Sequence, residues 1–428
     1  MLIRFCLYGF LKNQRYFEAF WVLAFLEMGL SFAMIGLLLG FREVATAILE
    51  IPAGLIADLL GRRWSLIAAH VAYIAAFVTF GLTSSVWVLF LAMLAFAIGE
   101  AFRSGTHKAI IFAWLKQQGR EDEKTHVYGI TRSWSKFGSA ISVVIGAVCV
   151  FVFQDYVAIF WFSVIPTGLN IVNFLGYPQE CDGRRPNRDG DSGIVKTLRQ
   201  GVAQCFSKPS LRRPIVESMG FEGMYSSSKD YLQPLVQQMA LVLPLFVAFA
   251  DAQRTAVMIT VVYCLFYLLG GIASRYAGPI LSRLGSEASA TRWLWSGFIA
   301  AFVLLLVGTL TPLSGFSIAS LLLVAILQNL WRPILIGRVA NAADEDSLAT
   351  VFNVESLAKS LGVAMMASLI GMAITYAPQT YRFVPIAIFG ILIGLVALAS
   401  AGHSLSQQKS LGRESRTEAF DRSNRGQV

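Results

Sequence analysis

The sequence contains few charged residues. Only 14% of its 428 residues are Asp, Glu, Lys or Arg, whereas soluble domains average about 25%. Hydrophobic residues make up 56% of the chain, and a soluble fold of this length has too little interior to bury that much apolar surface. The composition excludes a soluble enzyme and a disordered chain, and it predicts an integral membrane protein.

Residues that build metal centres and disulfide scaffolds are also scarce. The five cysteines and four histidines are scattered, without the short spacings of metal ligands. No Gly-x-x-x-x-Gly-Lys-Ser/Thr loop for ATP phosphates occurs, which leaves ATP-driven pumping unsupported. We expect no metal, no cofactor and no enzymatic activity. A membrane-embedded enzyme stays only as a third alternative, because no nucleophile–base pair stands out.

The net charge of +9 would suggest nucleic acid on a soluble protein, but here it has another explanation. Basic residues concentrate in the cytoplasmic loops of polytopic proteins. Most of the Lys and Arg residues fall in segments predicted to lie on one side, and the opposite loops hold only Arg42, Arg254 and Arg382. We expect no nucleic-acid partner, both termini in the cytoplasm, and a bacterial inner (plasma) membrane location. Residues 1–15 are expected to be a cytoplasmic segment and not a cleaved signal.

Apolar runs of about 20 residues, the length that crosses a bilayer, occur twelve times. They predict an all-α membrane protein with twelve transmembrane helices in two six-helix bundles. The predicted spans are 17–39, 41–60, 65–83, 86–115, 127–152, 156–177, 213–238, 254–276, 292–312, 315–337, 348–375 and 381–402.

The longest polar stretch between spans lies in the middle of the chain. Residues 1–178 are therefore predicted to form an N-terminal bundle and residues 212–402 a C-terminal bundle. The loop 179–211 between them carries apolar residues at helical spacing, which suits an amphipathic helix on the inner membrane surface; a solvated linker is the alternative. The polar tail 403–428 is predicted to be disordered.

An internal repeat relates the two predicted bundles. The segment 54–63 reads Gly-Leu-Ile-Ala-Asp-Leu-Leu-Gly-Arg-Arg, and 278–287 keeps the two glycines at the same spacing. Lys136 in the fifth span is matched in the same way by Lys359 in the eleventh. Parallel repeats of six spans are an architecture of secondary transporters.

The segment 54–63 resembles the loop signature of the major facilitator superfamily, roughly Gly-x-x-x-Asp-x-x-Gly-Arg-Lys/Arg. The resemblance implies twelve spans in two bundles, solute transport by alternating access, and a latch between the bundles on the cytoplasmic side in which the acid faces the start of span 11. Gly54 would allow close helix approach and Gly61 a tight turn. The alternative for the two arginines is a topology signal alone. The predicted latch residues are Gly54, Asp58, Gly61, Arg62 and Arg63.

The sequence departs from the drug/proton antiporters of the superfamily that it resembles, which often carry a Gly-x-x-x-Gly-Pro motif in span 5. Residues 138–146 lack the Pro of the Gly-x-x-x-Gly-Pro motif, and Lys108 and Ala113 stand where acids are expected. These departures weaken a simple multidrug assignment. Efflux of an amphipathic compound and uptake of a polar metabolite or organic anion both stay open.

Charged residues within the predicted spans mark the candidate site, because an intramembrane charge faces a cavity or a partner. Spans 1, 4, 7 and 10 line the central cavity of the family that the chain resembles. Structural pairing of Glu100 with Arg103 and of Lys229 with Asp230 is the alternative to function. The candidates for binding substrate or proton are Glu27, Glu100, Arg103, His107, Lys229, Asp230, Asn329 and Arg332, and those for gating are Arg132, Lys136, Glu355 and Lys359.

We therefore predict a monomeric secondary transporter that moves a small solute across the bilayer with a coupling proton. A non-transporting sensor or scaffold on the same fold is the alternative. The substrate, the direction and the coupling ion do not follow from the sequence.

Overall fold

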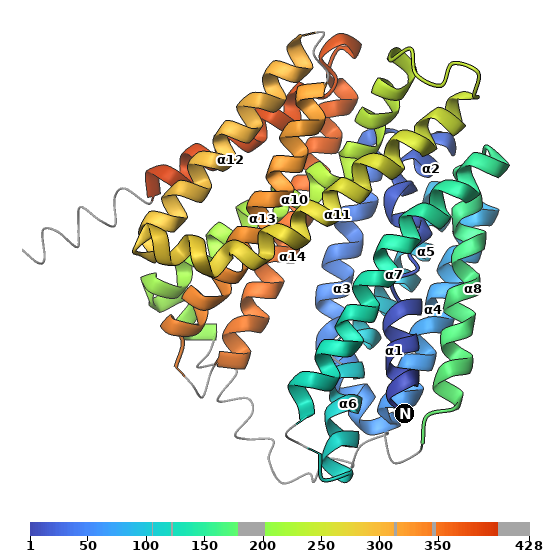
Figure 1. Ribbon diagram of the computed structural model, residues 1–428, viewed down its shortest axis with the longest axis vertical. Coiled ribbons are helices and arrows are strands. Elements are labelled where there is room, and N and C mark those ends of the chain that lie inside the picture. Colours follow the sequence, from blue (N-terminus) through green and yellow to red (C-terminus); the bar gives the residue numbers. More distant parts are fainter. Residues whose placement is uncertain (105, 121–122, 179–201, 312–314, 345–347, 401–428) are drawn as a thin grey trace, which may run out of the picture.

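The chain folds into two bundles of long helices that lie side by side (Figure 1). The computed structural model describes residues 1–104, 106–120, 123–178, 202–311, 315–344 and 348–400. Within these ranges, nine helices are long and apolar enough to cross a membrane, and Val384–Ser400 is a shorter apolar helix. The expected all-α membrane fold is confirmed, although the described helices do not by themselves fix the number of spans at twelve.

The N-terminal bundle contains the helices up to residue 175. Its core contacts join α3 with α5, α4 with α5, α4 with α8, and α1 with α7. The helices are α1 (Leu2–Leu11), η1 (Tyr16–Ala19), α2 (Trp21–Glu27), α3 (Phe32–Leu60), α4 (Arg62–Leu82), α5 (Val86–Arg103), α6 (Thr106–Gln117), α7 (Lys124–Phe153) and α8 (Ala158–Leu175).

The expected positions of the first two spans, 17–39 and 41–60, are wrong. The chain reverses at Gly29, whose φ of 87° is accessible to glycine, and the Ser31 side chain caps α3 by accepting a hydrogen bond from the Met34 N–H. α3 is then one helix from Phe32 to Leu60. The segment before it, α1, η1 and α2, is a helix interrupted between residues 12 and 20.

The C-terminal bundle contains α10 and all later helices. α10 packs on α13 and α14, and α13 packs on α11 and α12. Phe221 of α10 stacks on the buried Trp331 of α13, with ring centroids 4.4 Å apart, at the centre of this bundle. The helices are α10 (Pro209–Val242), α11 (Asp251–Leu284), α12 (Glu287–Leu310), α13 (Gly315–Ala342), α14 (Leu348–Tyr376), η6 (Gln379–Tyr381) and Val384–Ser400.

The repeat seen in the sequence corresponds to equivalent helix ends. Gly61 ends α3 with φ 100°, and Gly285 ends α11 with φ 72°. Both values lie in the left-handed region that favours glycine, so the predicted tight turn at Gly61 is confirmed and has a counterpart in the other bundle. Gly54 differs from expectation: it is exposed, and a Cβ there would meet no described atom within 4 Å.

The two bundles meet through α3 with α14, α7 with α11, and α2 with α10. A Cβ on Gly36 would collide with the carbonyl oxygen of Ala367, and one on Gly371 would collide with that of Phe32. Glycine therefore allows α3 and α14 to approach closely near the start of α3. Gln253 of α11 donates a hydrogen bond to the Phe151 carbonyl of α7 (3.1 Å) at the same end of the molecule.

Most of the predicted central loop and all of the predicted tail, 403–428, lie outside the described residues. Residues 202–207 of the loop are helical, with Cys205 buried and Phe206 exposed. The part of the expected amphipathic helix at 194–199 is not among the described residues.

Candidate functional site

A polar cavity of about 310 Å³ lies between the two bundles. η1, α2, α3 and α5 contribute from the N-terminal bundle, and α10 and α14 contribute from the C-terminal bundle. We call it the central cavity. Its charged lining residues are Arg15, Glu18, Arg42, Glu43, Glu50, Glu100, Lys229, Asp230 and Lys359.

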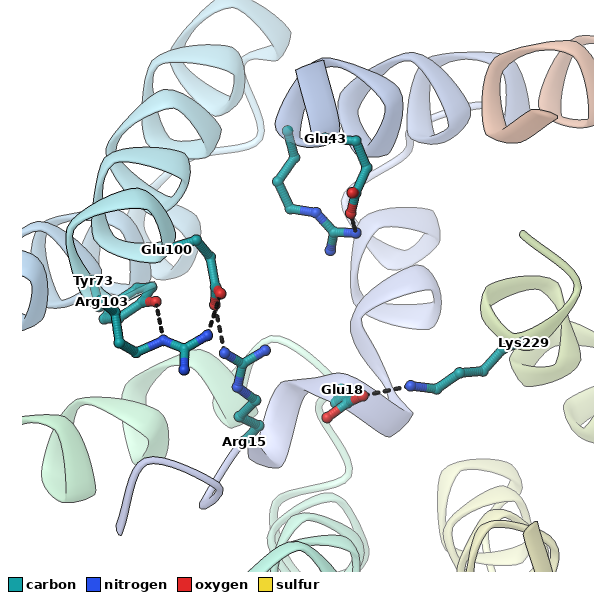
Figure 2. Close-up of polar contacts among 8 residues, drawn as sticks. Arg15, Glu18, Glu43, Tyr73, Glu100, Arg103 and Lys229 are labelled. Carbon is teal, nitrogen blue, oxygen red and sulfur yellow. Dashed lines mark hydrogen bonds and ion pairs between the residues drawn. The ribbon is translucent and has the colours of Figure 1, made fainter. Parts of the chain in front are cut away.

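Glu100 accepts hydrogen bonds from two arginines on one side of this cavity (Figure 2). Arg103 follows it by one turn on α5, and Arg15 comes from the interruption between α1 and η1. Arg103 also donates its Nε–H to the Tyr73 hydroxyl of α4 at 3.0 Å. Bonding to two guanidinium groups satisfies a carboxylate that is only 17% exposed and offsets its desolvation.

Lys229 of α10 forms an ion pair with Glu18 of η1 and so joins the two bundles (Figure 2). Gln233, one turn further along α10, donates to the Glu18 carbonyl (3.0 Å) and accepts from the Val22 N–H (2.9 Å). Of the two structural pairings considered as the alternative to function, that of Glu100 with Arg103 is present. That of Lys229 with Asp230 is not, because these adjacent helical residues point in different directions and Lys229 pairs with Glu18.

Asp230 instead accepts a hydrogen bond from the Trp21 indole, with Nε1 and Oδ1 3.3 Å apart. The Arg42 guanidinium lies over the Trp21 ring, 4.6 Å from its centroid, and forms an ion pair with Glu43 at 2.5 Å. In the described part of the chain, no cation lies within 4.0 Å of the Asp230 carboxylate. Asp230 is therefore a buried acid that is held by a neutral donor.

A second charge network lies within the C-terminal bundle. Arg332 of α13 binds both oxygens of Glu355 of α14, at 2.6 and 3.0 Å. Ser218 also donates to Glu355, which is 1% exposed. Glu222 accepts from Gln328 at 3.0 Å and lies 3.9 Å from Arg332. One arginine thus serves two buried carboxylates, as a planar guanidinium can.

The structure brings several of the predicted site residues together. Glu100, Lys229, Asp230 and Lys359 line the central cavity, and Arg103 binds Glu100 at its edge. Glu100, Lys229 and Lys359 lie far apart in the sequence, so the fold makes them neighbours.

Four predicted binding residues lie outside the central cavity: Arg332 in the second charge network, His107 in the N-terminal bundle, and Glu27 and Asn329. Glu27 ends α2 and accepts a hydrogen bond from the Tyr156 N–H (2.9 Å) before α8, outside the central cavity. Asn329 donates to the Ala325 carbonyl of its own helix (2.9 Å) and packs on Gly270 of α11. Both have structural partners, and neither lines the central cavity; a role for them in binding stays a prediction.

The remaining predicted residues of the N-terminal bundle lie nearer the end that carries residue 1. His107 is buried, 3.1 Å from the Tyr177 hydroxyl, with its ring against Tyr8. Arg132 and Lys136 are exposed on α7 and line a separate cavity with His107.

The predicted latch is described only in part. Arg62 donates to the Ala109 carbonyl (3.4 Å) and Arg63 to the Tyr177 carbonyl (2.9 Å), both within the N-terminal bundle. The side chain of Asp58 lies outside the described residues, and its contact with the start of span 11 stays a prediction.

Sequence reasoning missed Arg15, Glu18, Arg42 and Tyr73. Arg15 was expected in a cytoplasmic segment and Arg42 in an outer loop; the structure places Arg15 between α1 and η1, inside the bundle, and Arg42 within α3. The sequence does contain a signal for the position of Arg15, because Asn13, Gln14 and Arg15 interrupt an apolar run that starts at residue 2.

Comparisons with known proteins agree with this architecture. The family model described as Major Facilitator Superfamily matches residues 15–375. The chain is 28% identical over 169 residues to the Inner membrane transport protein YajR of Escherichia coli (strain K12), covering 39% of this chain and 35% of that one. It is 27% identical over 106 residues to the Uncharacterized MFS-type transporter YxaM of Bacillus subtilis (strain 168), covering 25% and 26%. The matches thus span about a third and a quarter of these relatives.

Solved structures show the same fold at low identity. A crystal structure of the nucleoside transporter NupG matches with a TM-score of 0.77 and 12% identity, covering 93% of this chain and 98% of that one. A crystal structure of a peptide transporter POT in complex with sulfate matches with a TM-score of 0.68 and 14% identity, covering 94% of both chains.

Proposed function

The chain belongs to the Major Facilitator Superfamily, and on that premise we propose that it is a membrane transporter that moves a small polar solute by alternating access, coupled to protons. The observation that carries this proposal is the central cavity, whose charged lining comes from both bundles. A site shared by two bundles opens to either side when they rock against each other, which is how repeat-built transporters expose a fixed site.

The interrupted first span supports a binding role for this cavity. Non-helical backbone is tolerated at membrane depth only where protein buries it or where it lines a cavity, and interrupted helices form the sites of many transporters. Here the interruption between α1 and α2 places Arg15 and Glu18 on the cavity wall.

The charges of the cavity favour a polar substrate over an amphipathic drug. The lining contains four cations and five carboxylates, and an apolar compound would leave many of them desolvated without new partners. A solute that bears both an acidic and a basic group, or an organic anion, could replace the partners that Glu100 and Lys229 have now.

Asp230 is our choice for the proton-coupling carboxylate. It is buried, it faces the central cavity, and its described partner is the neutral indole of Trp21. A carboxylate at membrane depth without a paired cation gains from protonation. The next residue along the chain, Lys229, forms the ion pair between the bundles. A change in the charge of Asp230 therefore acts close to the contact that joins them.

The conformation fits one stage of this cycle. The hydrogen bonds between the bundles gather at the end where α2 meets α10. If the N-terminus is cytoplasmic, as the distribution of basic residues predicts, this closed end faces outward and the chain adopts an inward-facing state, with both termini in the cytoplasm.

Flux through proteoliposomes tests the proposal. Amino acids, dipeptides, nucleosides and carboxylates are screened with and without an imposed pH gradient. We expect a pH gradient to drive accumulation of at least one of them, and Asp230→Asn to abolish this accumulation while retaining exchange of labelled for unlabelled solute. Asp251→Asn, at an exposed position, is the control.

Two results would contradict the proposal. Accumulation that ignores the pH gradient would remove proton coupling. Binding of a solute without flux in any condition would favour the non-transporting sensor or scaffold.

A further inference from the structure

A second and larger cavity, of about 560 Å³, lies within the N-terminal bundle. It is lined by α1, by the junction of α5 and α6, and by α7. We call it the basic cavity, because none of its described lining residues is acidic. Its basic residues are Lys12, Arg103, His107, Lys108, Arg132 and Lys136.

One face of α7 supplies much of this lining. Thr131, Arg132, Ser135, Lys136 and Ser139 recur at helical spacing and all line the cavity. The three hydroxyl groups donate to carbonyls of their own helix, at 2.8, 3.1 and 3.2 Å. The two cations are therefore the groups of this face that are left to bind a ligand.

The cations of the basic cavity lack carboxylate partners in the described part of the chain, with the exception of Arg103. Lys12 lies 5.4 Å from the centroid of the Tyr8 ring, and Lys108 lies 5.5 Å from those of Phe112 and Tyr128. Arg132 and Lys136 form no ion pair with a described residue. Charges of one sign gathered without a counter-charge repel each other, so an anion in the cavity would be strongly favoured.

The depth of these residues strengthens the argument. Lys136 is the thirteenth of the 30 residues of α7, a helix of about 45 Å when the hydrocarbon core is about 30 Å. It lies in the middle third of this helix, where a lysine needs a partner or a polar cavity. Acidic residues line the central cavity beside its cations, whereas none of the described residues that line the basic cavity is acidic.

We propose that the basic cavity is a binding site for a small anion that carries phosphate or carboxylate groups. Its volume is within the range of ligand sites, roughly 300–1,000 Å³. Arg103 lines it and also holds Glu100 at the central cavity. An anion that reaches Arg103 would compete with Glu100, and the basic cavity would thus collect the substrate for the central cavity. This last step rests on the proposed transport; the binding does not.

Calorimetric titration of the purified full-length protein in neutral detergent tests the site. The soluble probes are inorganic pyrophosphate and citrate, with chloride as the monovalent reference. We expect both probes to bind, and the variant Arg132→Gln/Lys136→Gln to bind them about tenfold or more weakly because two charges are lost. Arg132→Lys/Lys136→Arg keeps both charges and should bind like wild type.

A matched control removes two charges elsewhere. Arg283→Gln/Arg292→Gln changes exposed residues of α11 and α12, and it should leave binding unchanged. Thermal unfolding of each variant shows whether it is folded, and the charge-conserving variant supplies the comparison if the glutamine variant unfolds.

A lipid headgroup offers the same phosphate chemistry, so a second arm distinguishes the source. The protein is reconstituted in vesicles of phosphatidylcholine with and without phosphatidylglycerol, and retained lipid is measured by native mass spectrometry. Loss of phosphatidylglycerol from Arg132→Gln/Lys136→Gln, without binding of soluble probes to wild type, would identify the ligand as lipid.

The proposal is overturned if neither soluble probes nor phosphatidylglycerol bind, or if the control loses as much binding as the α7 variant. Binding without any solute flux in proteoliposomes would keep the anion site and remove the proposed transport cycle, so the two failures are distinguishable.

Discussion

Lys229 and Glu18 form an ion pair that joins α10 of one bundle to η1 of the other. Their side chains are 18% and 33% exposed, so the pair is partly shielded from water, yet it can be broken by a ligand that offers a competing charge. In the proposed transport cycle, this contact between the bundles would break and re-form as they rock.

Breaking this pair should reduce transport. Lys229→Gln leaves Glu18 without its cation and weakens the closed end, so we expect flux to fall about tenfold or more. The swapped variant Glu18→Lys/Lys229→Glu should recover part of the flux because the attraction is restored. Glu123→Gln, which removes an exposed pair with Arg120, should change little. Equal loss in the single and swapped variants would contradict a role for the pair itself.

Glu100 should be the most sensitive position in the N-terminal half of the site. Glu100→Gln leaves Arg15 and Arg103 close together without a counter-charge, which destabilises a shielded site by about 3 kcal/mol. Tyr73→Phe removes only one acceptor from Arg103, an effect of about 1 kcal/mol. Thermal unfolding in detergent should rank the variants in this order; the reverse order would mean that Glu100 does not hold the arginines.

The Arg332–Glu355 pair should respond as a buried unit. Arg332→Gln leaves Glu355 and Glu222 without a cation, and we expect a loss of about 3 kcal/mol, measured as a lower unfolding temperature. The double variant Arg332→Gln/Glu355→Gln should recover most of the lost stability. Lys208→Gln, in the exposed pair with Asp344, provides the comparison and should cost much less. A double variant no more stable than Arg332→Gln would count against direct pairing.

Gly36 should control closure of the bundles. Alanine there collides with the Ala367 carbonyl, so Gly36→Ala should disfavour this conformation and slow transport. A cysteine at Thr46, which lines the central cavity, should then react faster with a membrane-impermeant thiol reagent added at the end where α2 meets α10. Gly337→Ala, where a Cβ meets no described atom within 4 Å, is the control. Unchanged labelling would contradict this prediction.

The class of fold could be predicted from the sequence because apolar runs and signature glycines are local features. Gly61 illustrates this, because the residues around it already predict the helix end that determines its conformation. The clustering of Glu100 with Lys229 and Asp230 could also be predicted, since charged side chains inside the membrane usually face a shared cavity.

The pairing of these charges could not be predicted. Lys229 lies 211 residues from Glu18, and no local spacing distinguishes this partner from neighbouring Asp230. Arg15 was misplaced for a related reason: a polar interruption in an apolar run looks the same whether it ends a span or lies inside one.

The interruption between α1 and α2 has a mechanical consequence. The Gln14 N–H donates to the Leu11 carbonyl, and the Glu18 N–H donates to the Arg15 carbonyl. Each of these hydrogen bonds spans three residues, whereas those of an α-helix span four. The angle between α1 and α2 can therefore change without breaking regular α-helical hydrogen bonds inside the lipid. Arg15 and Glu18 lie in this interruption between α1 and α2. In the proposed transport cycle, recognition of a solute by either side chain would act directly on this interruption and so on the angle between α1 and α2.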